Sequence, residues 1–382
     1  MKERLTATSR RIRMVTEREG ARMPIYLDHA ATTPVDERVI DAITRCMREN
    51  FYNPSAAYSA AGQSRKAQRL ARNAVSRMLG CDQNEIYFTS GGTESNNWAM
   101  QLARGGHAVV SAIEHASVLE SAKNSAGSVT LVAPDADGVI RPEAVEAAIR
   151  PDTALVSVQW ANNETGVIQP VHEIAKAAHA CGAAFHTDAV QAFGHVPVDV
   201  QGIDLLSLSA HKFYGPRGAG CLYVRPGLSI APLMHGGGPE NGLRSGTENT
   251  PAICGLGKAA ELAEQDMAER SERERRLMNL FLHELSLPGA KVLGEHADRL
   301  PGVMALFLPG YESESIIAKM DLKGIQLSGG AACAAGSGEP SHVYRAMGLS
   351  DRDARCVIRI SVGRGNTPEE IVAAAQALKN IL

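Results

Sequence analysis

Short apolar runs alternate with segments of helical spacing along the middle of the chain, from residue 85 onward. The apolar runs are rich in β-branched and aromatic residues, which favours β-strands. They are "EIYFTS" at 85–90, "HAVVSAIEH" at 107–115, "TALVSVQWANN" at 153–163, "AAFHTDAVQ" at 183–191, "DLLSLSAHK" at 204–212 and "GAGCLYVRP" at 218–226. A helix is expected from about Thr93, and "VHEIAKAAHACG" predicts another that ends at Gly182. This alternation predicts an α/β fold with a mostly parallel sheet and helices on both faces.

The character of the chain changes after Pro251. Residues 252 to about 286 predict a long helix, and its charged part, "ELAEQDMAERSERERRLMNLFLHEL", is interpreted as a connecting helix with a solvated face. Residues 290–382 then mix strand-like runs, "GVMALFLP" and "RCVIRISVG", with helical ones, "ESIIAKMDLKG" and "PEEIVAAAQALKNIL". This mixture predicts a smaller α+β domain.

Composition excludes several classes of protein. The chain has 382 residues, of which 44% are hydrophobic and 21% charged, so it has enough apolar residues for the core of a soluble globular protein. The net charge of −3 argues against a general nucleic-acid or membrane-surface binder. No apolar run approaches the ~20 residues that a bilayer requires. The seven cysteines form no CxxC pair and are odd in number, which favours a reducing cytoplasm over a disulfide framework or a zinc site.

The first 22 residues differ from the rest of the chain. They carry more lysine and arginine than glutamate and show no apolar period. Organelle transit peptides are rich in arginine but poor in acidic residues, and three glutamates here argue against one. A disordered leader is expected, or a true start at Met23, and we assign the segment no function.

Two strand ends carry the residue types that pyridoxal phosphate requires. Lys212 follows a largely apolar run, and a desolvated lysine can form a Schiff base with an aldehyde. Asp188 closes another predicted strand, where its carboxylate can pair with a protonated pyridine nitrogen. The alternative for Lys212 alone is a side chain that reaches solvent at the strand end.

Two further strand ends complete this pattern. Gly91, Gly92 and Thr93 begin a helix whose free N–H groups suit a phosphate, although a single glycine-rich turn is weak evidence. His115 follows another strand, where an imidazole can stack on a ring and carry protons, although a structural histidine is the default among twelve. Ligands of parallel sheets bind beyond the carboxyl ends of the strands, so these residues are expected to meet.

A set of ordered motifs resembles the cysteine desulfurases, in the branch that serves iron–sulfur cluster and nitrogenase cofactor assembly. The resemblance runs from residue 26 almost to the end of the chain. Its motifs are "YLDHAATTPVD", "NPSAAYSAAG", "FTSGGTESNN", "EHASV", "WANNETGVIQP", "HTDAVQAFG", "SLSAHKFYGPRG", "LRSGTEN", "GAACAAGSGEPSHVYRAMG" and "IRISVGR". It implies a pyridoxal-phosphate-dependent transferase of fold type I, with a large domain at 38–268 and a small domain made of 23–37 with 269–382.

The resemblance also implies a role for each matching residue. Lys212 holds the cofactor as a Schiff base, Arg359 binds the substrate carboxylate, and Cys333 accepts sulfur from L-cysteine as a persulfide while alanine leaves. Arg359 could instead form only a salt bridge at a strand edge. The cofactor-binding residues implied are Gly92, Thr93, His115, Asn163, Asp188, Gln191, Ser209, His211, Lys212 and Thr247, of which His115 is also catalytic and Asn163 also contacts the substrate.

The resemblance extends to assembly and partners. Thr247 is implied to reach the phosphate of the neighbouring subunit, which makes the protein a homodimer. Cys333 lies on a glycine-flanked loop at about 327–341, which is expected to move between the cofactor and a sulfur-acceptor protein. No resident metal is expected, although Cys333 is a candidate to ligate a shared iron–sulfur cluster transiently. Neither a membrane nor direct nucleic-acid contact is expected, and Cys356 is predicted to be buried strand packing.

Two departures from the family bear on the acceptor. Ala334 and Ala335 follow Cys333 where relatives have serine or threonine, and the sequence ends at "QALKNIL" without the longer tail of housekeeping relatives. The acceptor therefore stays open among a cluster scaffold, a tRNA-thiolation enzyme and a DNA-sulfur modification enzyme. A selenocysteine lyase, an aminotransferase, another β-eliminating enzyme and an inactive binding component remain as alternative functions.

Overall fold

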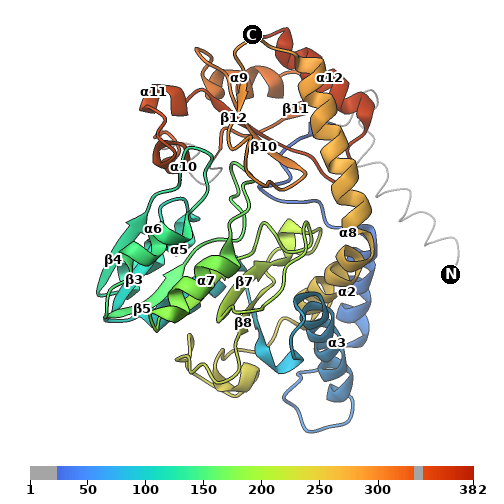
Figure 1. Cartoon of the computed structure of the whole chain (residues 1–382). Helices are drawn as coiled ribbons and strands as arrows, with labels where there is room; N and C mark the ends of the chain where they lie inside the picture. The colour runs from blue at the N-terminus through green and yellow to red at the C-terminus, as the bar shows by residue number, and fades with distance from the viewer. Residues whose placement is uncertain (1–23, 331–338) are drawn as a thin grey trace, which may run out of the picture.

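The computed structural model describes residues 24–330 and 339–382. The basic leader and Cys333 lie outside these described residues. Within them, a seven-stranded sheet forms the centre of the larger part of the molecule (Figure 1). Its strands, in spatial order, are β2 (Ile86–Thr89), β8 (Gly220–Val224), β7 (Leu205–Ser209), β6 (Ala184–Asp188), β5 (Thr153–Ser157), β3 (His107–Ser111) and β4 (Ser128–Val132).

The sheet confirms the predicted parallel arrangement. Strand β8 runs antiparallel to both of its neighbours, and the remaining pairs are parallel. The six predicted strands all form, whereas β4 was missed. Strand β4 lies at the edge of the sheet, and most of its side chains are exposed or half-buried. Its residues Val129, Leu131 and Val132 are apolar, so the sequence did carry a strand signal there.

Helices cover both faces of this sheet, as expected from the alternating pattern of the strands. Successive residues of β3 alternate between two apolar cores, with Val109 in one and Ala108 and Val110 in the other. The first core also takes side chains from α2 (Glu37–Glu49), α3 (Ala61–Leu79), α6 (Pro142–Ala148), α7 (Val171–Ala180) and α8 (Thr250–Leu285). The second takes them from α4 (Gly92–Met100) and α5 (Ala116–Ser125).

A smaller α+β region follows, as predicted for the C-terminal part of the chain. It contains an antiparallel sheet in the order β12 (Val357–Ser361), β10 (Val303–Phe307) and β9 (Lys291–Val292), and a parallel pair of β1 (Ile25–Tyr26) and β11 (Ile325–Gln326). Its helices are α9 (Ser313–Asp321), α10 (His342–Ala346), α11 (Asp351–Ala354) and α12 (Pro368–Lys379). Pairing of β1 with β11 joins the N-terminal segment to this region.

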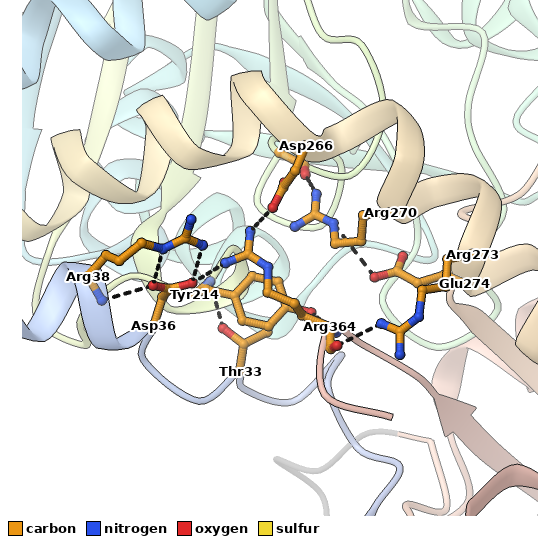
Figure 2. Close-up of polar contacts among 10 residues, drawn as sticks. Thr33, Asp36, Arg38, Tyr214, Asp266, Arg270, Arg273, Glu274 and Arg364 are labelled. Carbon is orange, nitrogen blue, oxygen red and sulfur yellow. Dashed lines mark hydrogen bonds and ion pairs between the residues drawn. The ribbon is translucent and has the colours of Figure 1, made fainter. Parts of the chain in front are cut away.

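Helix α8 connects the two regions, and it corrects one prediction. The helix packs against α2 and α3 in one region and α12 in the other (Figure 1). Its charged run was expected to face solvent, but Arg270 is 5% exposed and Glu274 is 1% exposed. Arg270 and Glu274 are buried because the chain near Arg364 returns over this part of the helix, where Arg364 pairs with Asp266 (Figure 2). No helix of residues 24–330 or 339–382 combines the length and apolar content that a membrane span needs.

Candidate active site

Ten of the predicted site residues line one cavity of about 410 Å³. They lie at the carboxyl ends of β6 and β7, in the segments that follow β2, β3, β5, β6 and β7, and in β12 of the smaller region. These residues are Gly92, Thr93, His115, Asn163, Asp188, Gln191, Ser209, His211, Lys212 and Arg359. The parallel topology therefore brings together side chains that are far apart in the sequence.

Lys212 lies at the end of a short 3-10 helix, Ala210–Lys212, that directly follows β7. Its Nζ donates to the carbonyl oxygens of Ala30 at 2.6 Å and Ala31 at 2.8 Å. The amine is thus held at the cavity by the N-terminal segment, and the alternative of a side chain that simply extends into solvent does not describe it.

Asp188 provides a buried carboxylate on the same cavity. Its side chain is fixed by two donors: Asn96 Nδ2 lies 2.7 Å from Oδ2, and the Val190 N–H lies 2.9 Å from Oδ1. Gln191, an implied cofactor-binding residue three positions after Asp188, lines the same cavity. Its Nε2 donates to the Ala30 carbonyl at 2.9 Å, so its amide is oriented by the segment that also receives Lys212.

One end of the cavity is suited to an anion. Helix α4 begins there, and Gly91 at its N-cap offers no side chain to its free N–H groups. Gly92 has to be small, because a Cβ at this position would lie 2.8 Å from Val190 Cγ2. Ser209 contributes a hydroxyl, and burial lowers the pKa of His211 to about 4, so this imidazole is neutral near pH 7.

His115 forms the N-cap of α5, which packs against α4. Its Nδ1 accepts the N–H of Ser117 at 3.1 Å, which leaves Nε2 to carry the proton of the neutral ring. Burial lowers the pKa of His115, while the Asp188 carboxylate acts in the other direction. A neutral imidazole at this place can donate or receive a proton.

Arg359 in β12 is the buried cation of the cavity, with 1% of its surface exposed. One terminal nitrogen, Nη2, lies 2.6 Å from Asp28 Oδ1, and Nη1 donates to the Asn163 carbonyl at 2.9 Å. The salt bridge that the sequence offered as an alternative exists. It also orients the guanidinium at the wall of the cavity, so the two interpretations are compatible.

Two predicted residues are not among those that line this cavity. Thr247 is exposed and lines a separate recess with Ser90 and Glu248. Cys333 lies outside the described residues. Cys356 is 3% exposed directly before β12, which confirms its prediction as packing.

Sequence reasoning missed five polar residues of the cavity, namely Asn96, Ser117, Gln159, Glu164 and His342. Glu164 is fully buried, burial raises its pKa, and its Oε2 accepts the Ser341 hydroxyl at 2.6 Å. His342 has Nε2 3.0 Å from the carbonyl oxygen of Glu114. Of these, Glu164 and His342 come from the motifs quoted for the resemblance near residues 160 and 340, "WANNETGVIQP" and "GEPSHVYRAMG", but nothing in their spacing distinguishes them from structural residues.

Glu114 next to His115 gives a testable pH dependence. Burial raises the pKa of its carboxyl from 4.5 to about 8, although Oε1 accepts the Gln159 N–H at 2.7 Å. The unfolded chain releases this proton near 4.5, whereas the folded chain keeps it to about 8, so its contribution to stability is lost as pH rises across that window. Glu114→Gln is expected to make the fall in unfolding free energy between about pH 5 and 7.5 shallower, by about 1 kcal/mol per pH unit.

Urea unfolding at a series of pH values checks this expectation. Glu120→Gln, an exposed change on α5, is the control and should leave the slope as in the wild type. Equal slopes for the wild type and Glu114→Gln would contradict the assignment of a protonated, buried carboxyl.

The residues present fit pyridoxal phosphate. The cavity combines a primary amine, a buried carboxylate and a helix N-terminus with a glycine that has no room for a side chain. These match the aldehyde, the pyridine nitrogen and the phosphate of the cofactor. Among the described residues, no group of three or more histidine, cysteine, aspartate or glutamate side chains is arranged to hold a metal.

Comparison with known proteins gives a consistent family. The model of the aminotransferase class-V family matches residues 25–373. The cysteine desulfurase IscS of Methanosarcina thermophila is 42% identical over 370 residues, covering 94% of this chain and 92% of its own. A solved NifS-like protein superposes with a TM-score of 0.87 at 34% identity, covering 94% of this chain and 99% of the other. The structure of SspA in complex with cysteine has a TM-score of 0.78 at 36% identity, with coverage of 89% and 99%.

Proposed function

The chain belongs to the class-V aminotransferase family and to the cysteine desulfurases, and we propose that Lys212, Arg359 and Cys333 carry its reaction. The reaction converts L-cysteine to L-alanine and transfers the sulfur to Cys333 as a persulfide. The observation that carries this assignment is the convergence of the Lys212 amine, the Asp188 carboxylate and the Arg359 guanidinium on one cavity.

Pyridoxal phosphate, when bound, supplies an electron sink that stabilises the electron pair left on Cα of an amino acid after its proton is removed. Asp188 would keep the pyridine nitrogen protonated, which would strengthen that sink. Asn96 and the Val190 N–H hold the Asp188 carboxylate in place. Gly92, Thr93, Ser209 and His211 would hold the phosphate. Gln191 would contact the ring hydroxyl, and His115 would stack on the ring; both line the cavity.

Arg359 binds the substrate carboxylate. A guanidinium forms paired hydrogen bonds with a carboxylate, and its burial strengthens them. The Asn163 side chain would contact the substrate beside Arg359. The backbone carbonyl of Asn163 accepts Nη1 of Arg359, which keeps the two residues together. The similar SspA structure contains cysteine, which supports a cysteine-sized substrate here.

Lys212 moves the proton at Cα. With cofactor and substrate bound, the Lys212 amine would act as the base that takes the proton from Cα. Return of a proton to the substrate completes the conversion of the carbon skeleton to alanine. His115, neutral with its proton on Nε2, is the second group able to give or take a proton.

Cys333 receives the sulfur. Its thiolate attacks the substrate sulfur, the bond from that sulfur to Cβ breaks, and a new S–S bond forms, so L-cysteine and a thiol become alanine and a persulfide. Gly330 and Ser341, on either side of its segment, both approach Glu164, which lines the cavity. A Cβ on Gly330 would be 2.8 Å from Glu164 Oε2, and the same oxygen accepts the Ser341 hydroxyl at 2.6 Å.

The function is tested with purified protein, pyridoxal phosphate, L-cysteine and a thiol reductant. Stoichiometric alanine and sulfide are expected, together with a persulfide on Cys333 when the reductant is omitted. Transamination without sulfide would favour an aminotransferase. A protein that neither binds the cofactor nor releases alanine would favour a binding component.

Arg359→Lys separates substrate binding from structure. The lysine keeps the charge beside Asp28 but loses the paired donors, so KM for L-cysteine should rise about tenfold or more, with a smaller change in kcat. Steady-state kinetics and thermal unfolding are measured on the same samples, with Arg355→Lys, an exposed arginine, as the control. A lowered Tm with an unchanged KM would show that the Asp28 salt bridge is the only role of Arg359.

The finer assignments complete the proposal. We place the large domain at 38–268 and the small domain at 23–37 with 269–382, since the core of the smaller region includes Ile25, Leu27 and α12. A homodimer is supported by exposed apolar side chains on and between α2 and α3, at Met47, Phe51 and Tyr58. In that dimer Thr247 reaches the phosphate of the other subunit. The protein acts in the cytoplasm, and its acceptor is a sulfur-receiving protein such as a cluster scaffold or a thiolation enzyme.

A further inference from the structure

Tyr214, two residues after Lys212, has a backbone conformation that bulky residues rarely adopt. Its φ is 67°, in the left-handed region where Cβ crowds the backbone. This conformation reverses the direction of the chain and closes a tight turn that contains Lys212. In this turn the Gly215 N–H donates to the Ala210 carbonyl at 2.9 Å. A Cβ on Gly215 would lie 2.7 Å from that of Ala210, so the turn leaves no space there.

One buried side chain holds the chain on both sides of Lys212. The Thr33 Oγ1 accepts the N–H of Tyr214 at 2.8 Å and donates to the carbonyl of His211 at 2.9 Å. The carbonyl of Lys212 itself accepts His195 Nε2 at 2.8 Å. The backbone that carries the amine is therefore fixed from three directions.

The ring of Tyr214 is held by the smaller region (Figure 2). Its hydroxyl oxygen accepts the backbone N–H of Arg364 at 2.7 Å, and the Arg364 and Arg270 guanidinium groups lie 4.5 and 5.4 Å from the ring centroid. Arg364 is anchored in turn, with Nη2 2.5 Å from Asp266 Oδ2 and an ion pair to Asp36. A Cβ on Gly363 would lie 2.5 Å from the Tyr214 hydroxyl, so the close approach requires glycine.

The contact between Tyr214 and Arg364 links the segment that carries Lys212 to the segment that carries Arg359. Arg364 follows Arg359 by five residues on the segment that leaves β12, and Tyr214 follows Lys212 by two. We propose that Tyr214 is a positioning residue, which sets the place of the Lys212 amine relative to the Arg359 guanidinium through its contacts with Thr33 and Arg364. The inference rests on the proposed function, and Tyr214 contacts the reaction only through Lys212.

Tyr214→Phe tests the proposal in the cofactor-loaded protein. The ring and its cation–π contacts remain, but the Arg364 N–H loses its acceptor. We expect kcat/KM for L-cysteine to fall about tenfold, the effect of one buried hydrogen bond. The visible circular dichroism of the bound cofactor should change, because it reports the geometry of the Lys212 linkage. Tyr223→Phe, in β8 and also buried, is the matched control and should leave both signals as in the wild type.

Thr33→Val provides the second variant, because it removes the same support from the other side of the turn with little change in shape. It should reproduce the spectral change of Tyr214→Phe. Wild-type spectra and kinetics in both variants, or a lower Tm with no spectral change, would overturn the positioning role. Failure of the proposed function is recognised separately, since the wild type itself would then show no cofactor band or no alanine.

Discussion

Lys212→Ala is expected to lower the rate of alanine formation from L-cysteine by about a thousandfold or more. The substitution removes the amine that attaches to the cofactor and the base that acts at Cα, and general base catalysis alone contributes roughly 10²–10⁴. The Ala30 and Ala31 groups that accept hydrogen bonds from its Nζ are carbonyl oxygens, which can neither form a Schiff base nor supply an amine. Those carbonyls would lose a donor as well, so thermal unfolding is recorded with the kinetics.

Two variants make this result specific. Lys123→Ala changes an exposed lysine of α5 and should retain wild-type activity. Lys212→Arg keeps a cation at the site but cannot form a Schiff base, because the guanidinium is protonated at all accessible pH values. It should be as inactive as the alanine variant. More than a tenth of the wild-type rate in either Lys212 variant would contradict the role of this amine.

Cys333→Ser is expected to abolish persulfide formation and to lower alanine production about a hundredfold or more, because a serine hydroxyl stays protonated where a thiol yields a thiolate. Cofactor binding should be unchanged, since the residues that line the cavity are untouched. Alanine is quantified by chromatography, and the persulfide by mass spectrometry of the tryptic peptide that contains residue 333.

Cys181→Ser is the control for this change, because Cys181 is an exposed thiol in the described part of the chain. An aminotransferase would not need Cys333, so persistent turnover in Cys333→Ser would favour that alternative or a β-eliminating enzyme. L-Selenocysteine is assayed beside L-cysteine. Turnover of selenocysteine alone by the variant would identify a lyase activity that does not pass through the thiol.

The sequence predicted the sheet well, because the signals involved are local. An apolar run such as 204–212 forms a strand wherever it is buried, and parallel strands end at one edge, so polar residues that close them meet there. Asp188, His115 and Lys212 were placed together on that basis, and they line the same cavity. Their chemical roles depend on the resemblance and on the proposals above.

Contacts between distant segments could not be predicted in this way. The carbonyl of Ala30 accepts both Lys212 and Gln191, and Asp28 pairs with Arg359 across 331 positions of sequence. No periodicity links such residues, because the N-terminal segment has no long element of its own and is placed by the pairing of β1 with β11.

The prediction that the charged run of α8 faces solvent was wrong for a related reason. Helical spacing shows that Arg270 and Glu274 share a face, but it does not show whether that face meets water or a second polar surface. Here the face meets the chain at Arg364 and the ring of Tyr214, so part of the run is buried. The same interface holds Tyr214, in the turn that carries Lys212. Interpreting this helix face as solvated therefore misses the contact between the helix and that turn.

Borohydride reduction of the cofactor-loaded protein, followed by peptide mapping, tests the central claim most directly. Reduction makes the Schiff base permanent, so the pyridoxyl group marks the lysine that carries the cofactor. The account predicts that the label lies on Lys212 alone and is absent from Lys212→Ala. A label on any other lysine of the wild type would contradict it.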